Sequence, residues 1–555
     1  MKINIFFTPV LLLFSSLSLH AQSWSWAKSL GSPNNSTTVK TLRPYTGKRA
    51  LVSGSFAAPS LSLGAQILAN AGQDDGYAAI VDETGQYSWA ARFGGSGRDV
   101  AVDAAAAPNG DFAVAGNFTS ISINIGGTNF FNSGETDAFI AKYNPDKTLA
   151  WARKIGSAEI DEASNVVVDA GGSTYVSGQV LDKFTLSTQY VFLRKYDAAG
   201  NLVWEQKGVT QGGIVQITAM TLDQNQQVYL CGWLWGTVNF GNTSLKCDTS
   251  YAAYILKYSP SGAVLDTYFN PSLDKINSVQ VHGNTLYCCA ERKFGCLGWG
   301  WPLSHSKVHL LQLDADLNTV WHQTAGGTES CLSLDIAQSV SVDDNGNAYV
   351  TGYFFSDTLV FAGQTLLNVF NINYYYPEIF VFKYSPAGEP LWAKSLGGIH
   401  SDEGTGILAF GDDQFYLGGN FESDPVAFGP YNLRNTSSLD SIHVHLSPSR
   451  YGRKTMGFLA VFDKNVSSIR PEPALGQVDI FPNPATDHLV LRLKVPAPSP
   501  LVLQISSPDG RVLRQSVYSG PMPEIREDLT ALPPGLYFVV LRTANGQFSG
   551  TFVKG

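Results

Sequence analysis

The sequence has few charged residues and no long apolar run beyond its first residues. Only 15% of the 555 residues are Asp, Glu, Lys or Arg, and the formal net charge is −9. Because binding to nucleic-acid phosphates needs clustered Lys and Arg, which are not visible here, we expect no nucleic-acid partner. No segment reaches the roughly 20 apolar residues that span a bilayer, so we expect no transmembrane segment in the mature chain.

Common signatures of catalysis and zinc binding are also absent. We find no GxSxG, HExxH or GxxxxGK[ST] motif, and no CxxC spacing. No cofactor is therefore expected, and the metal content stays open. The six cysteines, which allow up to three disulfides without a preferred pairing, are Cys231, Cys247, Cys288, Cys289, Cys296 and Cys331.

The first 21 residues predict a secretory signal peptide. They combine Lys2, an apolar run from Val10 to Phe14 and the small residue Ala21 at a cleavage position. The run is too short to anchor the chain in a membrane. We therefore expect export to an oxidising environment, where disulfides persist.

Glycine and aromatic residues are abundant, with 54 Gly and an aromatic share of 12%, which suits short strands joined by tight turns. A phrase Trp-Ala-x-x-x-Gly recurs along the chain. Its copies begin at Trp26, Trp89, Trp151 and Trp392, with weaker copies at Trp204 and Trp321. The intervals are 53 to 71 residues, apart from one of 117 that contains a degenerate unit, whose equivalent position is near Asp266. The repeat thus predicts seven units.

Two other phrases recur between the Trp copies. One resembles FAVAGNF, ending at Phe118, and the other resembles DAFIAKY, ending at Tyr143. Their alternating pattern and Gly turns predict four short strands in each unit. Radial repetition of such units is a β-propeller. The last unit ends near residue 465 without a Trp phrase, so we expect the orphan strand at Trp26 to complete it by contacting residues 458–462.

Residues 22–465 thus resemble the bacterial seven-bladed β-propeller repeat (SBBP) family, in which WAxxxGG, YVxGxF and DxFxxKY phrases recur. The resemblance is strong in units two, three, six and seven and poor in unit five. It implies an exported or surface-associated module without an assigned reaction. A scaffold of this kind leaves the ligand open.

After a linker at residues 466–477, residues 478–555 predict a small β-sandwich. Three motifs occur there in order, and they comprise Phe481, Pro482, Asn483 and Pro484, then Asp509 and Gly510, then Gly535, Leu536 and Tyr537. This segment resembles the type A sorting domain of type IX secretion in Bacteroidetes. The resemblance implies the type IX secretion machinery as a partner and a secreted or outer cell-surface location. These residues are expected to act as an address and to perform no chemistry.

Acidic residues follow the Trp phrase at a fixed spacing. They are Asp99, Asp161 and Asp402, with Glu162 and Glu403 next to two of them. We interpret the aspartates as acceptors of backbone hydrogen bonds that fix the crossing between units, with a cation or ligand site as the alternative. The segment Asp343 to Asn347 has spacing unlike a calcium loop and predicts a hairpin turn, with calcium as its alternative.

Unit five is irregular, and an irregular unit is where a specific site is most readily placed. It brings together Trp299, Trp301, His305 and His309, our candidate ligand-binding residues. Three interpretations stay open: packing of a loop on the blade edge, recognition of a carbohydrate or protein, and metal binding by the histidines. Trp233, Trp235 and residues 374–376 flank this unit and are expected mainly to fill the spaces between blades.

The preferred hypothesis is an all-β, non-enzymatic binding or scaffold protein, exported through its sorting domain, with a carbohydrate or protein ligand. A glycan-active hydrolase or lyase is one alternative. Two acids outside the repeat register that converge on one face would favour it. A purely structural surface or matrix component is the other alternative.

Overall fold

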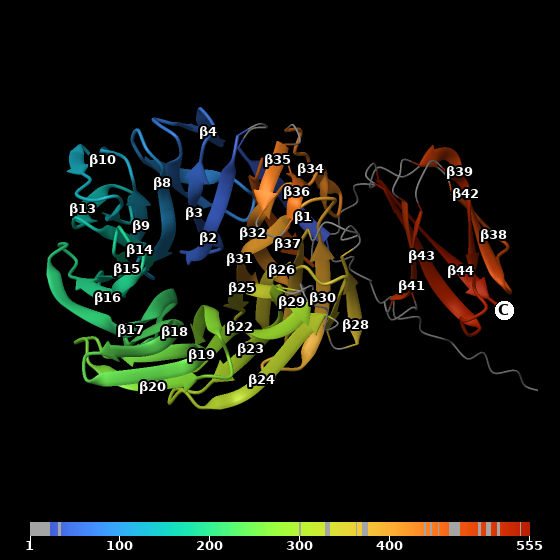
Figure 1. Cartoon of the computed structure of the whole chain (residues 1–555). Coiled ribbons are helices and arrows are strands. Elements are labelled where there is room, and N and C mark those ends of the chain that lie inside the picture. Colours follow the sequence, from blue (N-terminus) through green and yellow to red (C-terminus); the bar gives the residue numbers. More distant parts are fainter. Residues whose placement is uncertain are drawn as a thin grey trace, which may run out of the picture.

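The computed structural model describes residues 23–31, 35–298, 301–327, 334–361, 363–368, 376–437, 440–444, 447–452, 454–464, 478–497, 501–506, 512–518, 522–543 and 546–555. Every regular element in these residues is a β-strand. The strands form a closed ring and a separate small sandwich (Figure 1). The all-β prediction is therefore confirmed. None of the described residues forms a helix long and apolar enough to cross a membrane.

The described residues of the ring form seven four-stranded antiparallel units, which we call blades 1 to 7. Blade 1 contains β2 (Thr37–Tyr45), β3 (Arg49–Phe56), β6 (Asp75–Val81) and β7 (Tyr87–Phe93). Blade 2 contains β8 (Asp99–Ala106), β9 (Phe112–Phe118), β12 (Asp137–Tyr143) and β13 (Leu149–Ile155). Blade 3 contains β14 (Ile160–Val168), β15 (Thr174–Leu181), β16 (Thr188–Tyr196) and the first part of β17 (Leu202–Leu222).

The other four blades follow the same order. Blade 4 contains the rest of β17, then β18 (Val228–Phe240), β19 (Thr243–Tyr258) and β20 (Val264–Asn270). Blade 5 contains β21 (Lys275–His282), β22 (Thr285–Gly298), β23 (Trp301–Leu313) and β24 (Thr319–Gly327). Blade 6 contains β25 (Asp335–Val342), β26 (Ala348–Phe354), β29 (Glu378–Tyr384) and β30 (Pro390–Leu396). Blade 7 contains β31 (Asp402–Gly411), β32 (Gln414–Phe421), β37 (Met456–Asp463) and β1 (Ser23–Leu30).

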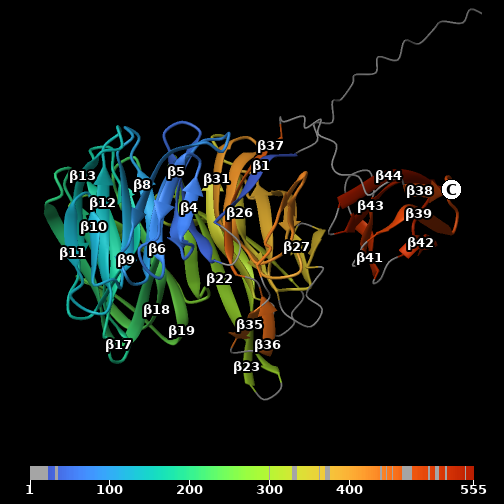
Figure 2. The same ribbon diagram turned by 90° about the horizontal axis from the view of Figure 1, so that it is seen from above.

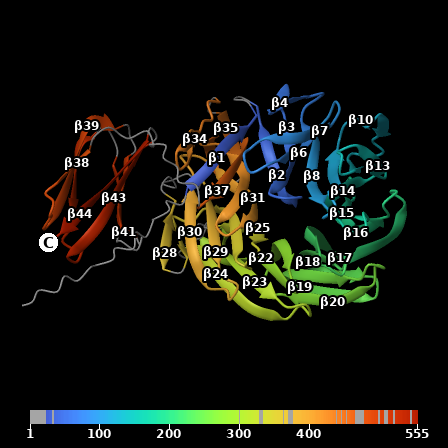
Figure 3. The same ribbon diagram turned by 180° about the vertical axis from the view of Figure 1, so that it is seen from behind.

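The first strand of each blade lies nearest the axis, and first strands of neighbouring blades contact one another around the whole ring (Figure 3). Among the described residues, seven clusters of buried apolar side chains each join two adjacent blades. The core therefore lies between the blades. Such packing makes the ring one rigid unit, because each blade buries both of its faces against its neighbours.

The ring closes by pairing its first strand with its last. Strand β1 runs antiparallel to β37, with Trp26 opposite Val461 and Ser29 opposite Phe458. Trp24 packs edge-on against Phe428 and Phe462 at centroid distances of 5.0 and 5.4 Å. The predicted contact between the amino-terminal strand and residues 458–462 is confirmed.

Four blades carry an additional hairpin between their second and third strands that the repeat did not predict. The hairpins are β4 (Ser60–Leu63) with β5 (Gln66–Ala69), β10 (Ser122–Ile125) with β11 (Thr128–Phe131), β27 (Thr358–Phe361) with β28 (Gln364–Leu367), and β33 (Val426–Phe428) with β34 (Tyr431–Leu433). Three of them lie against outer strands, with β5 contacting β7, β28 contacting β30 and β34 contacting β1. These three hairpins thus help to shield outer strands that would otherwise be exposed.

Blades 4 and 5 differ from the others. Strand β17 has 21 residues and passes from blade 3 into blade 4 without a turn, so that these two blades form one seven-stranded sheet. In blade 5, β22 and β23 pair from Leu286 opposite Leu313 as far as Gly298 opposite Trp301. Figure 2 shows this hairpin extending beyond the disc on the same side as β35 (Asp440–Val444) and β36 (Ser447–Gly452).

The carboxy-terminal residues form a two-layer sandwich. One sheet contains β38 (Val478–Phe481), β39 (His488–Ala497) and β42 (Met522–Asp528), and the other contains β40 (Leu501–Ser506), β41 (Val512–Tyr518), β43 (Gly535–Thr543) and β44 (Gly546–Lys554). Both sheets contribute to one apolar core, which includes Leu491 and Leu541. The predicted sandwich is confirmed.

Candidate ligand-binding site

The recurring Trp residues link successive blades. The indole N–H of Trp151 donates to the carbonyl of Ala198, 3.0 Å away in the next blade, and Trp204 donates in the same way to Pro260 at 3.1 Å. Trp26 and Trp321 donate to the equivalent turns of blades 1 and 6. The Trp repeat therefore stabilises the ring.

The degenerate unit preserves this connection with other residues. Asp266 lies opposite Lys257, as Trp204 lies opposite Lys195 in blade 3, so the predicted equivalence is confirmed. The Nζ of Lys257 donates to the carbonyl of Ala315 at 2.7 Å, in the turn that the missing Trp would reach. In blade 3 the equivalent Lys195 donates to the carbonyl of Pro260 beside Trp204, so in blade 4 the lysine keeps the connection without the indole.

The recurring aspartates are buried and accept hydrogen bonds between strands. Asp99 accepts from the backbone N–H of Gly95 at 2.7 Å and from the hydroxyl of Ser120 at 2.5 Å. Asp402 accepts in the same way from Gly398 and Ser423, and burial raises its pKa to about 7. Our interpretation that these acids fix the crossing between blades is confirmed.

Asp343 likewise has a local role. Its carboxylate accepts from the backbone N–H groups of Asn345 and Asn347 at 3.0 and 2.9 Å. The segment joins β25 to β26 as the predicted hairpin turn. Among the described residues, no group of three or more His, Cys, Asp or Glu is placed to hold a metal ion.

The four candidate residues of blade 5 are only partly described. Trp299 lies outside the described residues, and Trp301 begins β23 with an undescribed side chain. His305 and His309 are four residues apart on that strand, so about 13 Å of backbone separates them. The strand does not bring these two histidines together as a metal-binding pair.

Each histidine has a different aromatic neighbour. His305 stacks on Phe294 with ring centroids 5.0 Å apart. The Nδ1 of His309 lies 2.8 Å from Nε2 of His322 on β24. Burial, followed by the neighbouring His322, lowers the pKa of His309 to about 4. His309 is therefore neutral at pH 7, and its place in the structure fits packing within the blade.

Four of the six cysteines have described side chains, and all four are free and buried, namely Cys231, Cys247, Cys288 and Cys289. Burial raises the pKa of Cys289 to about 12, so that this thiol stays protonated and unreactive at neutral pH. Cys331 and the side chain of Cys296 lie outside the described residues.

Aromatic residues gather on blade 4 at the end where its second and third strands meet. Trp233 contacts Tyr251 edge-on, with ring centroids 4.9 Å apart. Trp235 and Tyr251 are 40% and 46% exposed, so they do not merely fill a space between blades. Residues 374 and 375 lie outside the described residues, whereas Tyr376 is buried as expected.

Two residues per blade occupy equivalent positions near the axis at this end, one on the first strand and its cross-strand partner on the second. We call these positions the end ring. The first-strand members are Thr38, Val100, Glu162, Gln216, Lys275, Ile336 and Glu403. Their partners are Ser55, Asn117, Gln179, Trp233, Glu291, Tyr353 and Asn420. Larger aromatic and charged partners thus concentrate in blades 4 to 6.

In blades 2 and 7 the end ring is structural. The side-chain amide of Asn117 accepts from the backbone N–H of Ala163 at 2.8 Å and donates to its carbonyl at 3.1 Å. Asn420 makes the same pair of hydrogen bonds with Val39. Both asparagines therefore join the second strand of one blade to the first strand of the next.

Blade 5 has a carboxylate at this position. Glu291 is only 4% exposed, and its Oε2 has no hydrogen-bond partner among the described residues. Its cross-strand partner Lys275 is half-buried. Tyr353 holds the same position in blade 6, and burial, followed by the charge of Glu403, raises the pKa of Tyr353 to about 12. The sequence motifs did not single out Lys275, Glu291 or Tyr353.

The first and last sorting motifs both lie beside the final strand of the sandwich. The backbone N–H of Val553 donates to the Oδ1 of Asn483 at 2.9 Å, and Ala485 pairs with Lys554. The Tyr537 hydroxyl donates to the carbonyl of Pro533 at 2.6 Å. The first and last motifs thus stabilise the final strand, whereas Asp509 and Gly510 lie outside the described residues.

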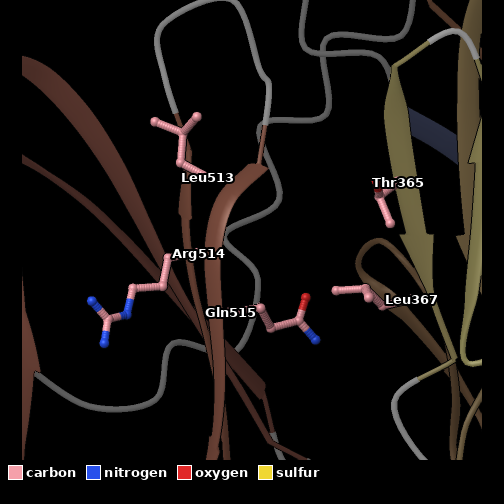
Figure 4. Close-up of a pocket in the computed structure, with 5 residues that line it drawn as sticks. All are labelled: Thr365, Leu367, Leu513, Arg514 and Gln515. Atoms are coloured by element: carbon pink, nitrogen blue, oxygen red, sulfur yellow. The ribbon is translucent and has the colours of Figure 1, made fainter. Parts of the chain in front are cut away.

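A shallow cavity of about 290 Å³ lies between β28 and β41. Thr365, Leu367, Leu513, Arg514 and Gln515 line it (Figure 4). The guanidinium of Arg514 points away from Leu367 and lies 2.9 Å from the carboxylate of Glu527. Arg514 is the one charged residue among those that line the cavity, and it is already paired with Glu527. The lining therefore offers no free charged side chain for catalysis.

Comparison with known families agrees with this architecture. Residues 479–554 match the family described as the secretion system C-terminal sorting domain. Residues 332–353 match the β-propeller repeat of the SBBP type. The chain is therefore a β-propeller protein that carries the SBBP repeat. Its sorting domain gives it a secreted or cell-surface location and implies interaction with the secretion machinery.

Individual relatives are distant. An uncharacterized WD repeat-containing protein of Acanthamoeba polyphaga mimivirus is 21% identical over 403 residues, which cover 57% of this chain and 29% of that protein. The chain thus spans less than a third of that relative. Sqt1 from Chaetomium thermophilum has a TM-score of 0.33 and 9% identity, covering 72% of this chain and 96% of its own. The endosialidase of phage phi92 has a TM-score of 0.34 and 9% identity, and the match covers 89% of this chain and 74% of the endosialidase chain.

Proposed function

We propose that this chain is a non-enzymatic binding protein of the cell surface or the surrounding medium, with the propeller as a rigid platform. Its ligand contacts the end of the ring where second strands meet third strands, in the sector of blades 4 to 6. The proposal rests mainly on the aromatic side chains gathered there, of which Trp235 and Tyr251 are the most exposed. Aromatic faces combined with a few polar groups are typical of ligand sites.

The hairpin of blade 5 extends this surface. Trp301, His305 and His309 belong to β23, and Trp299 precedes this strand in the sequence. We propose the hairpin of β22 and β23, together with these four residues, as part of the same ligand-binding surface. Strand ends of blades 4 and 5 lie on one side of the disc (Figure 2). A carbohydrate or a protein segment that lies across these blades would contact both.

The buried aspartates support binding in preference to hydrolysis. Asp99 and Asp402 each accept several hydrogen bonds that hold neighbouring loops in place. A general acid or nucleophile must instead reach the substrate. These acids are therefore committed to the scaffold, and turnover of a glycan or peptide by the purified chain would contradict the proposal.

The experiment is a binding screen with the full chain on printed neutral and acidic oligosaccharides. The test variant is Trp235→Ala/Tyr251→Ala, and a second variant is Trp299→Ala/Trp301→Ala. Ile67→Ala is the control, because Ile67 is an exposed apolar residue on the distant β4–β5 hairpin. Saturable binding that either test variant weakens at least tenfold, and the control leaves unchanged, is the expected result. Equal binding by all four proteins would overturn the proposed surface, and no binding by any would favour a structural component.

A further inference from the structure

We propose that Arg292 of blade 5 binds the carboxylate of an acidic saccharide whose sugar ring lies on the aromatic side chains of blade 4. The inference rests on the proposed binding function and adds the charge of the ligand and the residue that recognises it. It starts from two long hairpins in adjacent blades, β18–β19 and β22–β23, and from the sides on which they face each other (Figure 3).

The aromatic side chains of blade 4 lie on the side of that blade that faces blade 5. Cys231 belongs to the apolar cluster shared with blade 5, whereas Leu234 belongs to the cluster shared with blade 3. Because alternate residues of a strand share a face, Trp233 and Trp235 lie on the same side of β18 as Cys231. Tyr251 contacts Trp233 edge-on and lies with them. These rings continue the interface with blade 5 beyond its apolar core.

The opposite side of this interface carries cations. In blade 5, Ala290 belongs to the cluster shared with blade 4, so Arg292 and Phe294, at alternate positions of β22, also face blade 4. Lys307 and His305 on β23 are their cross-strand partners and share their side. The Cζ of Arg292 lies 5.0 Å from the centre of the Phe294 ring, which helps to position the guanidinium. Aromatic rings of blade 4 thus face an arginine and a lysine of blade 5.

One loop lies between the two hairpins and joins them. The backbone N–H of Ala253, the residue opposite Trp233 in the strand pair, donates to the carbonyl of Leu273 at 2.8 Å. The Nη1 of Arg292 donates to the carbonyl of the preceding residue, Ser272, at 2.9 Å. Ser272 is exposed and Arg292 is only partly buried. Arg292 and the strand pair of Trp233 therefore contact adjacent residues of one loop, at a place that is open to solvent.

Arg292 has hydrogen-bond donors to spare. A guanidinium carries five N–H donors, and among the described residues only the carbonyl of Ser272 accepts from Arg292. Arg292 forms no ion pair with a described carboxylate, whereas Arg43, Arg92 and Arg194 each form one. A planar guanidinium with free N–H groups binds a carboxylate through two parallel hydrogen bonds. The ligand that suits this side of the surface therefore carries a carboxylate.

The aromatic side favours a sugar as the rest of the ligand. The apolar face of a pyranose ring packs on aromatic rings, and the exposed Trp235 and Tyr251 also present an N–H and a hydroxyl to sugar hydroxyls. The indole N–H of Trp233 donates to the Oε1 of Gln216 at 3.1 Å, which holds its ring in place. A sugar ring fixes the distance between its carboxylate and its apolar face. The carboxylate of an acidic peptide instead lies on a flexible side chain that loses rotamer freedom on binding.

The test compares acidic oligosaccharides with the same oligosaccharides after reduction of their carboxyl groups to alcohols, printed beside acidic peptides. The full chain is used as wild type, Arg292→Met and Arg292→Lys. Arg98→Met is the matched control, because Arg98 is an exposed arginine between blades 1 and 2. We expect the wild-type chain and the control to bind acidic forms at least tenfold more tightly than reduced forms.

Arg292→Met should lose this preference and bind both forms as weakly as the wild-type chain binds the reduced ones. Arg292→Lys should keep part of it, because an ammonium supplies the charge without the planar fork. Trp235→Ala/Tyr251→Ala should weaken binding of both forms alike. Since the preference is a ratio of two affinities of one protein, partial unfolding of a variant does not change it.

The outcomes separate this inference from the broader proposal. Saccharide binding without a preference for the carboxylate, or a preference that Arg292→Met leaves intact, would overturn the subsite and leave the binding surface standing. Equal weakening of both forms in Arg292→Met would also overturn carboxylate recognition. Binding of acidic peptides alone, dependent on Arg292, would overturn the saccharide as ligand. Failure of the wild-type chain to bind any printed molecule would overturn both this inference and the proposed function.

Discussion

Gly200 in blade 3 lies against the indole of Trp151 in blade 2, and a Cβ built on this glycine would stand 2.7 Å from the ring. Gly200 also has a φ of +81°, in the left-handed region that favours glycine. The same relationship joins Gly262 to Trp204 and Gly388 to Trp321. Glycine in this turn thus admits the Trp that links one blade to the next.

The first prediction separates the two roles of this glycine. Gly200→Ala should destabilise the propeller by roughly 1–3 kcal/mol more than Gly212→Ala, because the added methyl group collides with Trp151. Gly212 has a similar φ of +73° but no atom within 4 Å of its built Cβ, so it reports the backbone cost alone. Urea unfolding of both variants measures the difference. Equal destabilisation would show that the contact with the Trp151 indole contributes nothing to the difference in stability.

The second prediction concerns blade 5, which, like blade 2 with Lys147, has a non-glycine residue at this turn position. Leu317 occupies the turn position of Gly200 with a φ of +59°, and the preceding blade has Asp266 in place of Trp. Leu317 is buried in the core between blades 4 and 5, where an indole would lie. Asp266→Trp alone should therefore destabilise the ring, whereas Asp266→Trp/Leu317→Gly should be more stable than the sum of the single changes predicts.

A double-mutant cycle measures this coupling. We expect an interaction energy of about 1–3 kcal/mol, as for residues in direct contact. Additive effects within about 0.5 kcal/mol would mean that the two positions do not compete for one space.

The third prediction tests ring closure. Trp24→Ala should lower the free energy of unfolding by about 3–5 kcal/mol, because Trp24 is 5% exposed and packs against blade 7. Trp235→Ala, at an exposed Trp, should cost about 1 kcal/mol or less. Thermal unfolding compares the two. Similar losses would argue that β1 adds little to the closed ring.

Much of this fold could be predicted from the residues. The Trp phrases, their spacing and the orphan strand at Trp26 predicted the ring and its closure, because each phrase reports a strand with its own turn. The hairpins such as β4–β5 were missed. Their strands have only three or four residues, so pairs such as Leu61 and Leu63 give too short an alternation to identify beside the stronger phrases.

The candidate site was harder to predict for a different reason. Glu291 stands out only because it occupies the position of Asn117 and Asn420 in other blades. Recognising this equivalence requires the strand register of blade 5, where the repeat motif is poorly preserved. An alignment of residues 289–292 (CAER) with residues 115–118 (AGNF) would have revealed the equivalence. The two histidines are only four residues apart in the sequence, but an extended strand holds His305 and His309 apart in space.

The last prediction concerns pH. Asp402 is fully buried, and burial raises its pKa from 3.8 to about 7 despite hydrogen bonds from Ser423 and Gly398. A carboxyl group whose folded pKa lies above its unfolded pKa stabilises the fold in its protonated form. This contribution is complete below about pH 4 and is lost as pH rises towards 7. The loss is about 1.4 kcal/mol for each pH unit within that window.

Asp402→Asn removes this titration, so the difference in unfolding free energy between the wild-type chain and this variant should fall as pH rises from 4.5 to 7.5. Asp197→Asn is the control, because hydrogen bonds from Asn201 keep the pKa of the exposed Asp197 below its usual value. That control should show no slope in the same window. A wild-type stability that rises relative to Asp402→Asn would mean that the bonds from Gly398 and Ser423 outweigh burial, and that Asp402 is ionised in the folded ring.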